Sequence, residues 1–512
     1  MTLSTLPVNW MALQNGSDIR GVALEGVPGE AVNLTPEVTN ILGQAFGTWL
    51  AAALKKPTTA LVIAVGRDSR LSGPRLMQAV MEGLAALGSQ VLDVGMASTP
   101  AMFMSTVLPE FNCDGAIMLT ASHLPFNRNG LKFFTRQGGL SKEDITQLLH
   151  LAEQGNFTEA TTPGSIESRH LIAAYSEELV QRIRQAVNHP EQFDRPLAGL
   201  KIVVDAGNGA GGFYASQVLE PLGADTRGSQ FLDPDGTFPN HIPNPENEAA
   251  MAALRQAVVA QGADFGIIFD TDVDRGAAVD HQGRDLNRNR LIALLAAIVL
   301  QEHPGTTIVT DSVTSDGLTQ FIEGTLGGLH HRFKRGYKNV INEALRLNAA
   351  GQPCWLAIET SGHGAMRENY FLDDGAYLVS KLLVELAKAR LAGRRLTDLI
   401  APLPEPQESE EFRITIQGAD FKTLGTTVID QLPGFVATQP GWTVVPNTYE
   451  GVRVACAGPE EQGWFLLRLS LHDPVLPLNI ESNVEGGVAK IAARLHTFFK
   501  PLGGLDSSAL AR

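Results

Sequence analysis

The chain has 512 residues, of which 44% are hydrophobic and 19% charged, and its mean hydropathy is +0.00. This composition excludes an intrinsically disordered or membrane-embedded chain, and the length predicts about three or four domains. The formal net charge of −15 argues against nucleic acid or an anionic membrane as the main partner, so we expect neither.

Five short apolar runs are each expected to form a buried strand that ends in a polar cluster. In chain order they are residues 61–65, 115–119, 265–269, 355–358 and 464–467. Amphipathic helical patterns lie between them, for example at residues 145–152 and 377–396. The alternation predicts α/β layers with parallel or mixed sheets, whose ligands bind beyond the carboxyl ends of the strands.

Residues 402–406 read Pro-Leu-Pro-Glu-Pro and form the strongest linker candidate, while other turn-rich or charged stretches lie at residues 161–165, 234–248 and 281–290. The longest apolar run, residues 291–300, is about half the roughly 20 residues of a membrane-spanning helix and predicts a buried helix.

The three cysteines are Cys113, Cys354 and Cys456, and they lie far apart in sequence. This spacing indicates neither a disulfide framework nor a zinc site. A secretory signal has a basic region followed by a long apolar core. Neither feature is found near the start of this sequence, where the first basic residue is Arg20. We therefore expect a cytoplasmic protein.

Asp270, Asp272 and Asp274 alternate along the chain, and in an extended segment all three carboxylates would lie on one side. Such carboxylates repel one another unless a cation lies between them, and hard oxygen ligands suit Mg²⁺. Two alternatives stay open. One is a solvated acidic turn, and the other is a haloacid-dehalogenase-type phosphatase with Asp270 as nucleophile, although that family usually has Thr or Val where Asp274 stands.

Ser122 lies in the motif Thr120-Ala121-Ser122-His123, and Lys132 follows shortly after. A serine beside a histidine suggests a hydrolase, yet a Ser-His-Asp triad is defined by geometry, and no Gly-x-Ser-x-Gly elbow surrounds Ser122. The other interpretation from the residues alone is a loop in which Ser122 caps a helix.

Taken together, the motifs resemble those of the α-D-phosphohexomutases, the phosphoglucomutase/phosphomannomutase superfamily. The matching motifs, in the family's order, are Ser17-Asp18-Ile19-Arg20-Gly21, Gly66-Arg67-Asp68-Ser69-Arg70, Thr120-Ala121-Ser122-His123, Asp270-Thr271-Asp272-Val273-Asp274-Arg275 and Glu359-Thr360-Ser361-Gly362-His363. Weaker matches at residues 203–205, 208–212 and 234–240 extend the resemblance over nearly the whole chain.

The resemblance implies an α/β fold with three similar mixed α/β sandwich domains around a central cleft and a smaller C-terminal α+β domain. The implied domains are residues 1–166 with the phosphoserine loop, 167–288 with the metal-binding loop, 289–403 with the sugar-binding loop and 404–512 with the phosphate-binding loop. We expect a monomer, with a dimer as the alternative.

The resemblance also implies a role for each matching residue. Ser122 would be the phosphoserine, and its phosphate would bind Mg²⁺ together with Asp270, Asp272 and Asp274. Lys132 and His363 would assist proton transfer, and Arg275 would stabilise the phosphoryl group. The implied substrate-binding residues are Arg20, Arg67, Lys334, Lys338, Glu359, Ser361, His363, Arg468 and Ser470. The alternatives are a charge-screening Lys132, a structural His363, and a solvated charged turn at Lys334 and Lys338.

The sequence departs from the family pattern at three places. The usual Arg-x-Ser-Gly-Thr or Arg-x-Ser-Asn-Thr loop is replaced by Arg468-Leu469-Ser470-Leu471-His472-Asp473-Pro474. Leu124 replaces an Asn, and Thr271 replaces a Gly. Leu471 and Asp473 are expected to hinder phosphate binding by the loop, which bears on the choice of substrate and on mutase turnover.

The implied function is interconversion of hexose 1-phosphate and hexose 6-phosphate, for glucose and/or mannose, through a hexose 1,6-bisphosphate. The expected ligands are hexose phosphates, Mg²⁺, and glucose 1,6-bisphosphate as activator or intermediate. The alternatives are a glucose 1,6-bisphosphate synthase with another sugar bisphosphate as donor, a phosphoglucosamine mutase, and a non-catalytic sugar-phosphate sensor.

Overall fold

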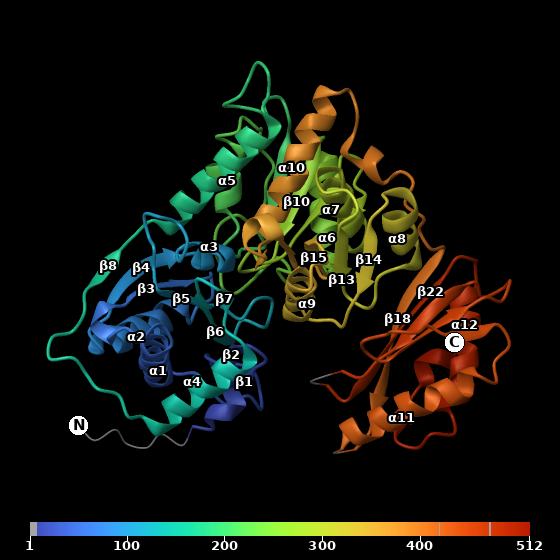
Figure 1. The fold of residues 1–512 in the computed structure, drawn as a ribbon, viewed down its shortest axis with the longest axis horizontal. Coiled ribbons are helices and arrows are strands. Elements are labelled where there is room, and N and C mark those ends of the chain that lie inside the picture. Colours follow the sequence, from blue (N-terminus) through green and yellow to red (C-terminus); the bar gives the residue numbers. More distant parts are fainter. Residues whose placement is uncertain (1–7, 419, 471–472, 512) are drawn as a thin grey trace. The chain divides into compact units, whose positions relative to one another are not determined.

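The computed structural model describes residues 8–418, 420–470 and 473–511 (Figure 1). The chain divides into two compact units, which we call the first unit and the second unit. The first unit consists of Met1–Asn287 and Ser361–Leu396, and the second of Arg288–Thr360 and Thr397–Arg512.

The first unit begins with an eight-stranded mixed sheet, in the order β1-β2-β6-β5-β3-β4-β8 with β7 paired to β6. The strands are β1 (Gln14–Asn15), β2 (Asp18–Val22), β3 (Val62–Arg67), β4 (Gln90–Met96), β5 (Gly115–Leu119), β6 (Arg128–Thr135), β7 (Gly138–Gly139) and β8 (Ile166–Ser168). The helices of this part are α1 (Pro36–Leu54), α2 (Gly73–Ala86), α3 (Thr99–Met104) and α4 (Lys142–Gln154). Apolar side chains of α1, α2 and α4 pack with those of β3, β5 and β6 in one buried core.

A four-stranded sheet follows, in the order β12-β11-β10-β9, where β9 and β10 are parallel and the other neighbours antiparallel. Its strands are β9 (Ile202–Asp205), β10 (Phe265–Phe269), β11 (Gly276–Asp280) and β12 (Asp285–Leu286). The first unit also contains the antiparallel pair β16 (Gly364–Met366) and β17 (Leu372–Asp373). Its remaining α-helices are α5 (Leu171–Val187), α6 (Glu248–Gln261) and α10 (Gly375–Leu391).

The second unit contains a parallel group of strands and an antiparallel sheet. The parallel strands are β13 (Thr307–Thr310), β14 (Leu329–Arg332) and β15 (Cys354–Ile358), with helices α7 (Arg288–Glu302), α8 (Asp316–Thr319) and α9 (Tyr337–Ala349). The antiparallel sheet is six-stranded, in the order β19-β20-β21-β22-β18-β23. Its elements are β18 (Glu408–Ile416), α11 (Phe421–Val436), β19 (Trp442–Val444), β20 (Val452–Cys456), β21 (Gly463–Leu467), β22 (Val475–Ser482), α12 (Gly487–Phe499) and β23 (Leu505–Asp506). Helices α11 and α12 pack against this sheet around a core of their own.

The predicted elements are confirmed, with small differences at their ends. The runs at residues 115–119 and 265–269 coincide with β5 and β10, and residues 291–300 form the buried centre of α7. The helix expected at residues 377–396 ends at Leu391, because Gly393 takes a left-handed conformation with φ +65°. No helix in the described part of the chain is long and apolar enough to cross a membrane. The three cysteines are buried, and none of them forms a disulfide within the residues that the structure describes.

Candidate active site

The three aspartates converge in a tight turn between β10 and β11. The carboxylates of Asp270, Asp272 and Asp274 offer ligand atoms that all lie within 4.8 Å of one another, and all three side chains are buried. The expected extended segment is wrong, because the chain turns after Phe269 and Val273 takes a left-handed conformation with φ +67°. A β-branched residue rarely adopts this conformation, so the surrounding fold must impose it.

The aspartate turn has unsatisfied acceptors that suit a cation. Asp272 Oδ1 and Asp274 Oδ1 are buried and accept no hydrogen bond from any residue that the structure describes. Burial, together with the two neighbouring carboxylates, raises the pKa of Asp270 well above its ordinary value. A hard divalent cation would satisfy these oxygens and remove the repulsion, so the donor set fits Mg²⁺.

Lys132, on β6, points its ammonium group at the same turn. Its Nζ lies 3.0 Å from Asp272 Oδ2 and 2.5 Å from Asp274 Oδ2, and the side chain is buried. Burial opposes the ionisation of Asp274, but Lys132, with His363 and Arg275, lowers its pKa below the ordinary value. The lysine therefore neutralises part of the charge of the aspartate turn.

Ser122 follows β5 and contacts this turn directly. Its hydroxyl donates to Asp270 Oδ2 at 3.0 Å, and Arg275 Nη2 donates to Ser122 Oγ at 3.1 Å. The backbone of Ser122 is left-handed, with φ +50°, and its N–H donates to Thr120 Oγ1. The loop leads into β6 rather than into a helix, so the interpretation of Ser122 as a helix cap is wrong.

His123 does not form a triad with Ser122. Its Nδ1 is 3.3 Å from Ser122 Oγ but only 2.7 Å from Arg275 Nη2, and no carboxylate of the described residues holds the ring. Burial and the nearby Arg275 lower the pKa of His123 to about 3. A ring that resists protonation and lacks an orienting carboxylate cannot serve as the general base of a Ser-His-Asp triad.

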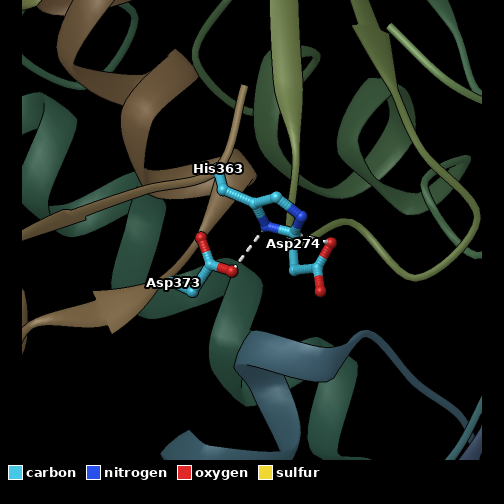
Figure 2. A group of neighbouring side chains, drawn as sticks. All are labelled: Asp274, His363 and Asp373. Carbon is cyan, nitrogen blue, oxygen red and sulfur yellow. Dashed lines mark hydrogen bonds and ion pairs between the residues drawn. The ribbon is translucent and has the colours of Figure 1, made fainter. Parts of the chain in front are cut away.

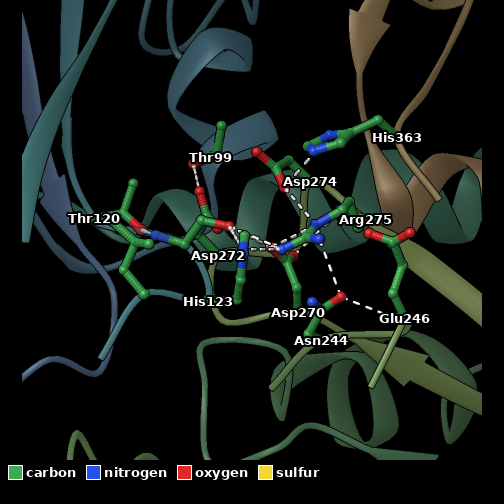
Figure 3. Close-up of polar contacts among 12 residues, drawn as sticks. Thr99, Thr120, His123, Asn244, Glu246, Asp270, Asp272, Asp274, Arg275 and His363 are labelled. Atoms are coloured by element: carbon green, nitrogen blue, oxygen red, sulfur yellow. Dashed lines mark hydrogen bonds and ion pairs between the residues drawn. The ribbon is translucent and has the colours of Figure 1, made fainter. Parts of the chain in front are cut away.

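Arg275 connects the serine with the aspartates. Its Nε and Nη2 donate to Asp270 Oδ2 at 3.2 and 3.1 Å, and its Nη1 donates to Asn244 Oδ1 at 3.1 Å (Figure 3). Asn244 also accepts the N–H of Glu246. Asn244 was not predicted from the sequence, because it lies in a stretch interpreted only as a domain boundary. Its position between Pro243 and Pro245 is the signal that could have indicated it.

His363 is held by two carboxylates (Figure 2). Its Nδ1 is 2.6 Å from Asp373 Oδ2 and 3.8 Å from Asp274 Oδ1. Burial opposes protonation, but these carboxylates raise the pKa of His363 to about 9. The backbone of His363 also pairs with that of Arg275. Asp373, on β17, was not found from the sequence.

Thr99, the first residue of α3, orients Asp272 (Figure 3). Its hydroxyl donates to Asp272 Oδ2 at 2.5 Å, and its N–H donates to the Asp272 carbonyl at 2.8 Å. Both residues are buried. Thr99 was not predicted from the sequence, because it lies 173 positions from Asp272.

We expect Thr99→Val to weaken binding of a divalent cation by about 10–100-fold, because an outer hydrogen-bond partner that orients a metal ligand is lost. Valine keeps the shape of threonine, so the melting temperature should change little. The cation concentration for half-maximal activity and calorimetric titration measure the effect. Thr106→Val is the matched control, since the Thr106 hydroxyl donates to the Phe103 carbonyl instead. Equal affinities in the two variants would contradict this role.

Two further residues of the first unit were expected to bind the substrate. Arg20, on β2, lies 3.0 Å from Asp18 Oδ2 and 3.5 Å from the Thr120 carbonyl. Arg67, at the end of β3, is half-buried and donates to the Asp68 carbonyl. Burial lowers the pKa of Arg67. The structure thus brings Arg20 next to the serine loop.

Ser361 begins the second segment of the first unit. Its Oγ is buried and has no hydrogen-bond partner among the described residues. A buried hydroxyl without a partner is unusual in a folded protein. Ser361 also lies in the Glu359–His363 motif that the resemblance relates to sugar binding, and this position distinguishes it from other buried serines.

In the second unit, Glu359 lies at the end of β15 and accepts the N–H of Gly336 at 2.6 Å. Gly336 caps α9, whose second residue is Lys338. Lys334 Nζ lies over the ring of Phe333, 5.6 Å from its centroid. The structure therefore places Glu359 beside the basic stretch that contains Lys334 and Lys338.

Arg468, after β21, faces an acidic residue that the sequence analysis did not identify. Its Nε lies 3.8 Å from Glu450 Oε1, and Glu450 Oε2 accepts the N–H of Arg335 at 3.1 Å. Ser470 Oγ accepts the N–H of Asp473 at 3.1 Å. Leu471 and His472 lie outside the described residues. A carboxylate thus stands opposite the arginine expected to bind phosphate.

Comparison with known proteins gives matches over nearly the whole chain. Family models described as phosphoglucomutase/phosphomannomutase α/β/α domains I, II and III match residues 11–158, 173–283 and 287–406. A phosphoglucomutase of Neisseria meningitidis serogroup A is 31% identical over 477 residues, covering 93% of this chain and 94% of the relative. A phosphomannomutase/phosphoglucomutase of Pseudomonas aeruginosa is 32% identical over 494 residues, or 96% of each chain.

Among solved structures, a phosphoglucomutase/phosphomannomutase family protein from Burkholderia thailandensis is 30% identical, with a TM-score of 0.78. The match covers 98% of this chain and 99% of that one. These matches confirm the expected fold class of three α/β domains followed by a C-terminal domain that the structure shows to be rich in strands.

Proposed function

The chain belongs to the phosphoglucomutase/phosphomannomutase family and is a phosphohexomutase, and we propose that it interconverts the 1- and 6-phosphates of glucose and/or mannose through a phosphoserine at Ser122. The resemblance inferred from the motifs is thereby confirmed. One observation carries the proposal: Ser122 and Asp270, 148 positions apart, are in hydrogen-bond contact at 3.0 Å. The serine thus stands beside the buried aspartates that fit a metal.

In the proposed reaction, the bond between phosphorus and Ser122 Oγ breaks as a hydroxyl oxygen of the sugar phosphate bonds to the phosphorus. This gives hexose 1,6-bisphosphate and free Ser122. After the bisphosphate reverses its orientation, its other phosphoryl group returns to Ser122 Oγ, and the isomeric monophosphate leaves. The net result is an intramolecular phosphoryl transfer, with hexose 1,6-bisphosphate as intermediate and activator.

The proposal assigns Asp270, Asp272 and Asp274 to Mg²⁺, together with the phosphate on Ser122. The ion supplies charge neutralisation and polarisation of the phosphoryl oxygens when it is bound. Arg275 donates to Ser122 Oγ and to Asp270, so it can stabilise the charge of the phosphoserine.

Two basic residues border the serine and the aspartates and are the proposed groups for proton transfer to and from the sugar hydroxyl. Lys132 is held by Asp272 and Asp274, and His363 by Asp373. The carboxylate of Asp373 at Nδ1 orients the ring of His363.

Each unit by itself contains proposed substrate-binding residues. In the first unit they are Arg20, Arg67, Ser361 and His363; in the second they are Lys334, Lys338, Glu359, Arg468 and Ser470. A carboxylate such as Glu359 can accept hydrogen bonds from two neighbouring sugar hydroxyls, which suits a sugar that binds in two orientations. The cytoplasmic location, the monomeric state and the four domain boundaries remain predictions.

A second candidate, a glucose 1,6-bisphosphate synthase, is favoured by one contact. Glu450 stands opposite Arg468, so its charge competes with a phosphate for this arginine. A weak phosphate site would release the bisphosphate before it reverses. The intact Ser122 and aspartates, and relatives named as mutases, argue against a non-catalytic sensor.

The decisive experiment measures product formation from the 1-phosphates of glucose, mannose and glucosamine, with and without added glucose 1,6-bisphosphate or fructose 1,6-bisphosphate. We expect activity on glucose and/or mannose that is stimulated by catalytic amounts of glucose 1,6-bisphosphate. Preference for glucosamine would indicate a phosphoglucosamine mutase. Stoichiometric consumption of fructose 1,6-bisphosphate would indicate the synthase.

We expect Arg468→Ala to raise the KM for hexose phosphate by roughly tenfold to over a hundredfold, because a charge-assisted contact worth about 1.5–3 kcal/mol is lost. Steady-state kinetics measure the change. Lys490→Ala, which removes an exposed cation from α12, should leave KM unchanged. An unchanged KM in Arg468→Ala, with free bisphosphate released by the wild type, would count against a mutase and for the synthase.

A further inference from the structure

Arg70 lies between β3 and α2, and its side chain is completely buried at 0% exposure. Its guanidinium contacts main-chain carbonyls of the loop that contains Ser122. Nη1 donates to the carbonyls of Pro125 and Arg128 at 2.8 Å each, and Nη2 donates to those of Ser122 at 2.5 Å and Leu124 at 2.6 Å. The two Nη groups carry four hydrogens, one for each carbonyl.

Asp68 supplies the opposite charge. Its Oδ2 lies 3.4 Å from Arg70 Nε, its Oδ1 accepts the Arg70 N–H at 2.9 Å, and its side chain is also 0% exposed. A buried guanidinium is tolerated only when it is paired and hydrogen-bonded. Because Asp68 occupies the Nε side, the whole outer edge of the guanidinium is available to the loop.

The motif at residues 234–240 packs against Arg70. The ring of Phe238 lies 5.3 Å from the guanidinium carbon of Arg70. A Cβ atom on Gly236 would lie 2.5 Å from the backbone nitrogen of Leu71 and 2.8 Å from Arg70 Cα, so only glycine allows this approach. Arg70, to which the resemblance assigns no role, therefore packs against the motif at residues 234–240, which has no assigned role either.

The contacts of Arg70 affect Ser122, because the left-handed backbone of Ser122, with φ +50°, must be stabilised by its surroundings. Thr120 fixes its N–H, Arg70 fixes its carbonyl, and Asp270 accepts from its hydroxyl. We propose that Arg70 is a positioning residue that holds the serine loop so that Ser122 Oγ points at the metal-binding aspartates. This inference rests on the proposed role of Ser122 as phosphoryl carrier.

Arg70→Lys tests the inference, because lysine keeps the charge opposite Asp68 but cannot donate to four carbonyls in two directions. We expect kcat to fall on the order of a hundredfold, the size of effect typical of a misplaced reacting group. The KM should stay nearly constant, since the proposed substrate contacts are intact. Hydrogen exchange should become faster in residues 120–128 and stay unchanged elsewhere.

Arg136→Lys is the matched control, since Arg136 Nε also donates to a main-chain carbonyl, that of Thr106, away from the serine loop. It should keep wild-type kcat and exchange. Wild-type kcat in Arg70→Lys would overturn the inference. So would a loss of activity with faster exchange throughout the chain, because Arg70 would then be merely structural.

Phe238→Leu covers the case in which Arg70→Lys does not fold, because it loosens the packing over the guanidinium and leaves every charge in place. A smaller fall in kcat with faster exchange in residues 120–128 would support the inference, and no change in either would overturn it. Mass spectrometry of the wild type distinguishes a failure of the proposed function from a failure of the inference about Arg70. Phosphate absent from Ser122 overturns the proposed function and this inference together, whereas phosphate present with unaffected Arg70 variants overturns the inference alone.

Discussion

Ser122→Ala is expected to remove nearly all phosphoryl transfer, because Ser122 Oγ is the oxygen proposed to carry the group. Loss of a nucleophilic serine typically lowers kcat by about 10⁶-fold. The substitution also removes the hydrogen bond to Asp270 and the acceptor for Arg275 Nη2, but it creates no cavity larger than one oxygen atom. The conversion of glucose 1-phosphate to glucose 6-phosphate measures the loss.

Ser176→Ala is a suitable control, since Ser176 is a buried serine of α5 whose Oγ has no hydrogen-bond partner in the described part of the chain. It should retain wild-type activity. In the wild type, peptide mass spectrometry should find phosphate on Ser122. Phosphate on Asp270, which hydroxylamine would remove from an acyl phosphate but not from a phosphoserine, would instead support the phosphatase alternative.

The elements that position the site could be predicted because their signals are local. Residues 115–119 and 265–269 are continuous apolar runs followed by polar residues, the pattern of a strand buried on both faces, and the structure places β5 and β10 there. Charge repulsion likewise predicted that the three aspartates surround a cation, and the structure brings their carboxylates together.

The path of the aspartate segment could not be predicted from propensities. Val273 is β-branched and favours a strand, which supported the extended interpretation. In the structure its φ is +67°, and its carbonyl accepts the N–H of Gly375 at 3.1 Å. That bond comes from a segment about a hundred positions later in the chain, so a tertiary contact overrides the local preference.

Thr99, Asn244 and Asp373 were missed for the same physical reason. Each is a common polar residue in a turn or at the end of an element, and each acquires its role only by meeting Asp272, Arg275 or His363 in the folded chain. Glu450 in the second unit was missed for the same reason, because it acquires its role only by meeting Arg468. The sequence indicated that the loop after Arg468 is unusual, but only the fold shows which carboxylate faces it.

The second large effect is expected from the metal site. Exhaustive chelation should abolish activity, and added Mg²⁺ should restore it, because the proposed site has two buried carboxylate oxygens that no described residue satisfies. Full activity in excess chelator would contradict the metal assignment. The result is independent of which sugar is the substrate.

Asp272→Asn tests the ligand set itself. The amide removes a negative charge and places an NH₂ group or a weaker carbonyl acceptor where Asp272 Oδ2 meets the Thr99 hydroxyl and Lys132. Cation affinity should therefore fall by more than the roughly 10–100-fold expected for an outer partner such as Thr99. Asp225→Asn makes the same charge change at an exposed pair with Arg227 and should leave affinity unchanged. Saturating Mg²⁺ should recover most of the activity in Thr99→Val but little in Asp272→Asn, because only Asp272→Asn loses an anionic ligand. Equal recovery in both variants would show that Asp272 is not a ligand of the cation.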